Sequence, residues 1–150
     1  MKFMKAACLL LLCLLTAGAS AQNVTKATIT FHTTSDDKDG DSQIRDRIVC
    51  DNQDFLKLEC CSAGKHSKDD HFDDGSTKSR DMSLITPLRK ERLRSCSFVA
   101  GLTAKGNDRW IAIYTLDVTY QDGSREQFSF GEITLNSRNS GYVQEIKPIR

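Results

Sequence analysis

The chain has 150 residues, with 21 Lys and Arg against 20 Asp and Glu and only two prolines. This length suits one domain, and a net charge near zero argues against a general binder of nucleic acid or of anionic membrane surfaces. No low-complexity tract or internal repeat is present, so we expect a single folded domain.

Residues 1–21 have the pattern of a secretory signal peptide. Two lysines form a basic start, residues 6–15 form an apolar core too short to span a bilayer, and Ala19-Ser20-Ala21 is a cleavage site of small residues. Cleavage after Ala21 leaves residues 22–150, with 19 basic (21 − 2) and 20 acidic side chains. We therefore expect a secreted, extracellular protein that is not integral to a membrane.

A glycosylation sequon lies near the start of the mature chain. It is Asn23-Val24-Thr25, two residues beyond the expected cleavage point. A glycan is sterically tolerated there, so Asn23 is a candidate glycosylation site.

Three strands are expected before residue 62. Ala27, Ile29 and Phe31 alternate with polar residues, which predicts a first strand with its odd-numbered side chains toward the core. The segment Ile44–Cys50 predicts a second strand and Phe55–Cys61 a third, each with even-numbered apolar residues facing inward.

The loop between the first two strands is rich in aspartate. Its four carboxylates within six residues repel one another unless a cation collects them, and Ca²⁺ prefers about six to eight oxygen ligands. The spacing is not that of an EF-hand, since Ser42 stands where the glycine is required and Ile48 where the last glutamate is required. The alternative is a solvated acidic turn in which Lys38 offsets part of the charge.

The loops of a sandwich gather at its two ends, so this acidic loop is expected to meet the residues that open a later hairpin. Such a meeting would collect enough oxygen ligands for Ca²⁺. The predicted ligands are Asp36, Asp37, Asp39, Asp41, Asn107 and Asp108.

Four cysteines remain after signal-peptide removal, and an even number in an oxidising compartment indicates two disulfides. They are Cys50, Cys60, Cys61 and Cys96. Because a bridge between adjacent residues strains the backbone, Cys60 and Cys61 are not expected to pair with each other. We expect one of them to pair with Cys50 and the other with Cys96, with both assignments open.

The segment Ser62–Arg80 is long and polar, and indicates a surface connection in which Phe72 is the one expected anchor. His66 and His71 follow the adjacent cysteines, but the spacing is not that of a zinc finger and extracellular thiols are usually oxidised. No zinc site is therefore predicted. The segment also holds a second acidic group: Asp69, Asp70, Asp73 and Asp74.

The next stretch combines short strands with the most basic part of the chain. Met82–Leu88 predicts a short strand that a proline closes, and Leu93–Ala104 predicts another. Between them, the charges of Arg89–Arg92 favour a solvated turn over an anion-binding patch.

The segment from Gly106 to Leu135 is predicted to form one long hairpin, around which the domain is organised. The even-numbered residues from Trp110 to Tyr120 are apolar at strict period two, in β-branched and aromatic company, which is typical of a strand. A last strand, Gly141–Ile149, is expected to turn Val143 and Ile146 inward.

The side-chain phase selects the hairpin turn. A three-residue loop, Gln121-Asp122-Gly123, places Leu116 opposite Phe128 and Tyr114 opposite Phe130, with Gly123 in the left-handed region. The apolar phase then changes from even to odd numbers after a glycine, so a bulge is predicted at Gly131.

Together these elements predict an all-β fold, an antiparallel β-sandwich of about eight strands stabilised by disulfides. They do not indicate an enzyme. No GxSxG motif is present, the three histidines pair with no candidate nucleophile, and the carboxylates lie in loops without apolar surroundings to raise a pKa.

Two segments, Thr33–Ile44 and Gly106–Leu135, carry a resemblance. Their TSDDKD, GNDRW and DGS motifs resemble a pattern of small secreted β-sandwich proteins and, in outline, the calcium-assisted sandwich domains of the PLAT and C2 type. The resemblance covers about a third of the mature chain and leaves out the cysteines and Ser62–Arg80. It implies Asp-rich loops at one end of a sandwich and implies no substrate.

The predicted function is a secreted, non-enzymatic binding module whose acidic loops hold Ca²⁺ and which engages an extracellular glycan, lipid or protein surface. The alternatives are an acidic matrix component and a secreted effector or toxin. Stoichiometric Ca²⁺ binding favours the first function, weak association at many sites the second, and membrane leakage the third.

Overall fold

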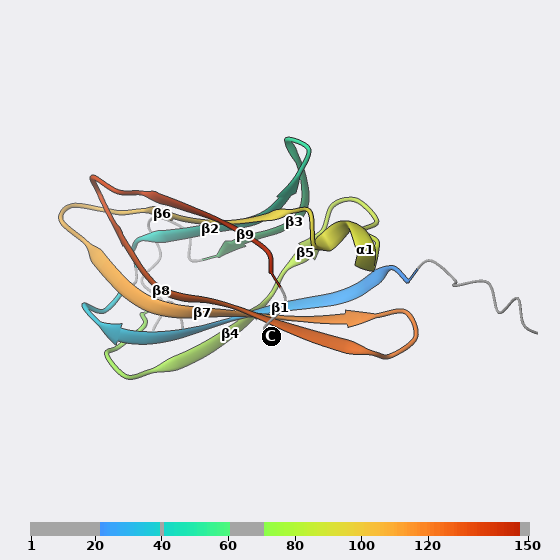
Figure 1. The fold of residues 1–150 in the computed structure, drawn as a ribbon. Helices are drawn as coiled ribbons and strands as arrows, with labels where there is room; N and C mark the ends of the chain where they lie inside the picture. The colour runs from blue at the N-terminus through green and yellow to red at the C-terminus, as the bar shows by residue number, and fades with distance from the viewer. Residues whose placement is uncertain (1–21, 40, 61–70, 148–150) are drawn as a thin grey trace, which may run out of the picture.

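The computed structural model describes residues 22–39, 41–60 and 71–147. Within these ranges the chain forms nine strands and one helix of a single turn, arranged as two antiparallel sheets that pack face to face (Figure 1). The predicted all-β sandwich is therefore confirmed. The elements are β1 (Val24–Ser35), β2 (Gln43–Cys50), β3 (Gln53–Cys60), β4 (Thr77–Asp81), β5 (Ser83–Leu84), α1 (Lys90–Leu93), β6 (Ser97–Thr103), β7 (Arg109–Tyr120), β8 (Arg125–Asn136) and β9 (Gly141–Glu145).

The four-stranded sheet has the order β4-β1-β7-β8, and the five-stranded sheet has the order β5-β3-β2-β6-β9. The helices described include none with the length and apolar character needed to cross a bilayer. The predicted signal peptide lies outside the described residues, as do Cys61, His66, Asp69 and Asp70.

Strands β7 and β8 form the predicted hairpin. The register pairs Thr119 with Arg125 and Leu116 with Phe128, and the turn between the strands has the three expected residues. Gly123 adopts φ 82°, a left-handed conformation that a residue without a Cβ reaches without steric cost. The predicted loop length is confirmed.

The predicted bulge near Gly131 is also confirmed, with one correction to the register. Tyr114 pairs with Gly131 and not with Phe130, because the ladder shifts by one residue between Thr115 and Tyr114. The extra residue lets Phe128 and Phe130 point inward before the bulge, and Ile133 and Leu135 after it.

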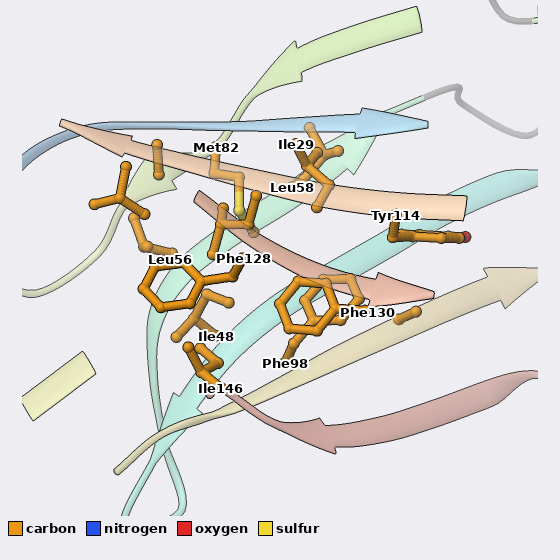
Figure 2. Packing of buried hydrophobic residues seen from close by; sticks show 14 of the residues in the cluster. Ile29, Ile48, Leu56, Leu58, Met82, Phe98, Tyr114, Phe128, Phe130 and Ile146 are labelled. Atoms are coloured by element: carbon orange, nitrogen blue, oxygen red, sulfur yellow. The ribbon is translucent and has the colours of Figure 1, made fainter. Parts of the chain in front are cut away.

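The core lies between the two sheets and is rich in aromatic rings (Figure 2). Phe98 from the five-stranded sheet stacks on Phe130 from the four-stranded sheet, with ring centroids 4.1 Å apart. Large rings that pack across the two layers bury extensive apolar area, so packing of this kind helps to hold the sheets together.

The disulfide joins Cys50 to Cys96, which shows that the predicted pairing of each with Cys60 or Cys61 is wrong. Strands β2 and β6 are neighbours with Val49 opposite Ser97, so the next residues outward face each other with Cα atoms 4.4 Å apart. In the β2–β3 ladder, Cys60 lies opposite Ile44, at the other end of β2 from Cys50. Six residues of extended strand separate the two ends by about 20 Å, beyond the reach of a disulfide.

The remaining differences concern segments with little apolar alternation. β4 lies inside the predicted surface connection, where polar residues on its outer face bond to β1, for example Thr30 to Ser79 at 2.8 Å. One turn of helix, Lys90–Leu93, replaces the predicted turn and the start of the next strand. In β9, Ile146 is buried as predicted, but Val143 is 66% exposed because its side chain faces outward.

Candidate metal centre

Three loops meet at the end of the sandwich where β1 ends and β7 begins, on the left of Figure 1. We refer to residues 36–39, 41–42, 71–76 and 105–109 as the acidic end. Its carboxylates are Asp36, Asp37, Asp39, Asp41, Asp73, Asp74 and Asp108, and its cationic side chains apart from histidine are Lys38, Lys105 and Arg109.

The expected meeting of the β1–β2 loop with the β6–β7 loop is present. Arg109 Nε lies 3.1 Å from a carboxylate oxygen of Asp36, and Lys105 Nζ lies 3.3 Å from one of Asp41. The Asp39 amide faces Asp108 Oδ1 at 3.5 Å. Ion pairs and backbone contacts thus fix one loop against the other.

The third loop is attached through a single antiparallel bridge between Lys38 and Phe72. The Lys38 amide donates to the Phe72 carbonyl at 3.2 Å, and the Phe72 amide donates to the Lys38 carbonyl at 3.1 Å. Both side chains are fully buried. The predicted role of Phe72 as an anchor to the core is therefore confirmed.

The interior side of this bridge is aromatic. The Phe72 ring lies 5.6 Å from that of Phe31 and 5.4 Å from that of Trp110, centroid to centroid. Lys38 Nζ lies 5.2 Å from the Phe72 centroid and donates to the Asp39 carbonyl at 2.7 Å. The buried ammonium is thus stabilised by a ring face and a backbone dipole beneath the acidic loop.

The exterior side of the same bridge carries the polar residues. Because side chains alternate along paired backbone, inward Lys38 and Phe72 leave their sequence neighbours outward. Those neighbours form a two-by-two array of Asp37, Asp39, His71 and Asp73. Ligand atoms of the first three all lie within 4.8 Å of one another.

His71 is the centre of this array. Its Nε2 atom lies 3.0 Å from Asp37 Oδ2 and 3.0 Å from Asp73 Oδ1. Ligand atoms bound at right angles to one metal at about 2.1 Å are about 3.0 Å apart, so this spacing suits a shared ion as well as a hydrogen bond. The imidazole of His71 and the carboxylates of Asp37 and Asp39 can therefore hold a divalent cation, with Asp73 beside the imidazole.

Asp108 adds a buried negative charge next to this group. It is 7% exposed, and no hydrogen-bond partner of its Oδ2 atom is found among the described residues. Burial raises the pKa of Asp108, and hydrogen bonds from the Ser42 hydroxyl and the Asp39 amide offset part of that effect. The hydrogen bonds to Asp108 thus do not fully compensate its buried negative charge, which lies next to Asp39.

The six predicted Ca²⁺ ligands do not converge on one point. Asp36 and Asp41 turn to Arg109 and Lys105, and Asn107 is exposed. Asp37 and Asp39 come together with His71, which the sequence does not indicate as a partner of the acidic loop. One sequence signal could have indicated this partner. Asp37-Lys38-Asp39 and His71-Phe72-Asp73 each have a central residue that faces inward between two polar residues that face outward.

A second cluster of charges lies at the opposite end of the sandwich, beside α1. Glu126 accepts from the Tyr120 hydroxyl at 2.7 Å and from Arg94 at 2.9 Å, and Lys90 Nζ lies 3.3 Å from it. Burial acts to raise the pKa of Glu126, but these three donors outweigh it and the pKa is lowered. Every polar atom of this carboxylate has a partner, which leaves little for a ligand.

Asn23 of the predicted sequon forms an isolated bridge with Arg89. Its glycosylation stays a prediction.

No protein-family model matches the chain, and no curated protein matches it. The similarity to PLAT and C2 domains therefore stays a prediction, and functional inference depends on the residues of this chain alone.

Proposed function

We propose that the protein is a secreted, non-enzymatic binding module whose acidic end holds a divalent cation. The observation that carries the proposal is the convergence of Asp37, Asp39 and His71, with ligand atoms within 4.8 Å, from two loops that the Lys38–Phe72 bridge joins. The predicted signal peptide and the Cys50–Cys96 disulfide support an oxidising, extracellular location.

The donor set indicates the class of cation. Ca²⁺ takes oxygen ligands almost exclusively, whereas an imidazole with carboxylates suits Zn²⁺ or Mn²⁺. We therefore propose a Zn²⁺-class ion at Asp37, Asp39, His71 and Asp73. Ca²⁺, the ion expected from the sequence, is the competing occupant, and it would use the oxygens without His71.

Contacts within the protein hold the backbone of the site. Lys38 Nζ supplies a fixed positive charge on the inner side of the loop, and the bridge to Phe72 holds the backbone. The ligands are thus pre-positioned, which lowers the entropic cost of binding. Asp37 and Asp73 are 49% and 75% exposed at the side chain, so a bound ion would remain open to a further ligand.

An open coordination position suits a module that recruits an extracellular partner through the metal. The same carboxylates lie exposed, without the apolar enclosure typical of a catalytic acid or base, which supports a binding role over an enzymatic one. A glycan, a lipid headgroup and a protein carboxylate can each supply the oxygen ligand.

Isothermal titration calorimetry with Zn²⁺, Mn²⁺ and Ca²⁺ tests the proposal. We expect one Zn²⁺ per chain, with affinity at least tenfold weaker in Asp37→Asn and His71→Gln. The matched control is Asp117→Asn on β7, a carboxylate bonded to Gln127 Nε2 at 2.8 Å and far from the acidic end. Ca²⁺ binding lost in Asp37→Asn but retained in His71→Gln would assign the oxygen-only site instead.

Two outcomes would contradict the proposal. Weak Ca²⁺ association at many sites, unaffected by either substitution, would favour an acidic matrix component. Leakage of dye from lipid vesicles on addition of the metal-free protein would favour an effector or toxin.

A further inference from the structure

The outer face of the five-stranded sheet carries a groove of about 390 Å³, and none of the acidic-end residues defined above is among its described lining residues. Outward-facing residues of β2, β3, β6 and β9 line it. Those used below are Arg45, Arg47, Lys57, Glu59, Gly101 and Gly141.

The groove exists because two neighbouring positions have no side chain. Gly101 on β6 pairs with Gly141 on β9, so that part of the face is bare backbone. A Cβ on Gly101 would lie 2.6 Å from the Arg45 carbonyl oxygen, so the close approach of β2 requires glycine there. At Gly141 the nearest atom would be 3.9 Å away, so a side chain fits and nothing in the fold demands its absence.

One cation beside this bare backbone is held in place without a carboxylate. Arg45 Nε and Nη2 both donate to Gln43 Oε1, at 3.0 and 2.9 Å. Glu59 lies opposite Arg45 on β3, and its pKa is lowered mainly by Lys57 and further by the charge of Arg45. The carboxylate forms its ion pair with Lys57, at 2.8 Å, and none with Arg45 among the described residues. The remaining donors of a pre-oriented guanidinium are therefore available to an anion.

The rest of the lining selects the anion. A guanidinium fork matches a carboxylate in geometry. Arg47, two residues along the same strand and about 7 Å away, is a second cation of the groove, but it lies 3.6 Å from Asp54, which offsets part of its charge. The acids Asp54 and Glu59 disfavour a densely charged chain, but they accept hydrogen bonds from hydroxyl groups. Among the described residues, no aromatic ring lines the groove to stack on a neutral sugar.

We propose that this groove binds a carboxylate-bearing oligosaccharide, a glycan that contains uronic acid. Arg45 pairs with a uronate carboxylate, the sugar ring lies over Gly101 and Gly141, and the acidic side chains accept from its hydroxyls. The site is independent of the metal centre.

Calorimetric titration with a tetramer of galacturonic acid tests the assignment, with a galactose tetramer as the neutral counterpart. We expect the acidic tetramer to bind at least tenfold more tightly than the neutral one. Arg45→Gln removes the charge, and Gly141→Val fills the groove. Each is expected to weaken binding at least tenfold, whereas Arg125→Gln on the other sheet changes it less than twofold.

Equal binding of both tetramers, or unchanged affinity in Arg45→Gln, would overturn the proposal. So would tighter binding of a sulfated heparin tetrasaccharide or of tetraglutamate, which would assign a sulfated glycan or an acidic peptide. Galacturonate binding that persists in excess chelator and in Asp37→Asn supports the groove, even where the metal titration fails. Binding that disappears under both conditions would overturn it.

Discussion

The two ends of the sandwich use charge in opposite ways. Beside α1, both oxygens of the Glu126 carboxylate have hydrogen-bond or ion-pair partners. The disulfide Cys50–Cys96 lies near them, since Cys96 follows Arg94 by two residues and directly precedes β6. At the acidic end, carboxylates outnumber cations and Asp108 is buried without full compensation. Such an imbalance lowers the stability of the folded state, so the end beside α1 stabilises the fold, and the acidic end is the one to which we assign the proposed cation site.

The largest test of this difference is removal of the aromatic anchor under the acidic end. Phe72→Ala should lower the free energy of unfolding by about 3–5 kcal/mol, because it leaves a cavity beside Phe31 and Trp110. It should also abolish Zn²⁺ binding, since the bridge to Lys38 loses its support. Urea unfolding and calorimetry measure the two effects.

Phe55→Ala is the matched control, since Phe55 is buried on β3 under Arg92 at the opposite end. It should cost a similar free energy and leave Zn²⁺ affinity unchanged. Wild-type affinity in Phe72→Ala would end the claim that the anchor shapes the site.

Loss of the covalent bond tests the other end. The double substitution Cys50→Ala with Cys96→Ala opens a loop with a sequence separation of 46, and chain entropy predicts a loss of about 4 kcal/mol. Cation affinity should not change. Urea unfolding of the two proteins under oxidising conditions gives the difference, and a loss of binding in the double variant would show that the ends are coupled.

Glu126→Gln gives a smaller effect and a pH signature. We expect a loss of about 1 kcal/mol at pH 7, because the pairs are only half-buried. The folded pKa lies below the ordinary value of 4.5, so the stabilisation is present above pH 4.5 and is lost as the pH falls through the folded pKa. Thermal melts of both proteins should converge in acid, and a constant gap at every pH would contradict the ion-pair account. Glu145→Gln, in a highly exposed pair with Lys147, should change nothing measurable.

Asp108→Asn should have a smaller effect than Glu126→Gln, with the opposite sign. A carboxyl with a raised folded pKa favours folding in acid, and that contribution is lost as the pH rises through the folded value. The amide removes this loss, so stability at pH 7 should rise by less than about 1 kcal/mol. Saturating Zn²⁺ should reduce the difference in melting temperature between Asp108→Asn and the native protein, because a nearby cation compensates the charge of the native carboxylate. A variant less stable at pH 7 than the native protein would show that the charge is already balanced.

The sequence predicts those strands that have one face buried in the core and the other exposed to solvent. The hairpin register, its three-residue turn and the bulge at Gly131 follow from period-two alternation, because a shift of one residue would bury polar side chains. β4 could not be predicted in this way, since as a polar edge strand it has no apolar phase. The disulfide could not be predicted without knowing that β2 and β6 are neighbours.

The candidate site was predictable in place but not in composition. The topology of a sandwich brings the acidic loop to the start of β7, and that meeting is present. His71 comes from a loop about 30 residues later, and it reaches Asp37 only because the Lys38–Phe72 bridge forms. A single bridge of two hydrogen bonds leaves no hydrophobic pattern long enough to detect.

The disulfide joins two strands of the same sheet and not one sheet to the other. A pull on the C-terminal end of β9 therefore loads its ladder with β6 first, together with Ile146, which is buried and donates through its amide to the Cys96 carbonyl. The hydrogen bonds of such a ladder break one pair at a time from its end. The Cys50–Cys96 bond then keeps β6 from separating from β2. A molecule under force at the end of β9 would lose this one strand and keep the rest of its fold.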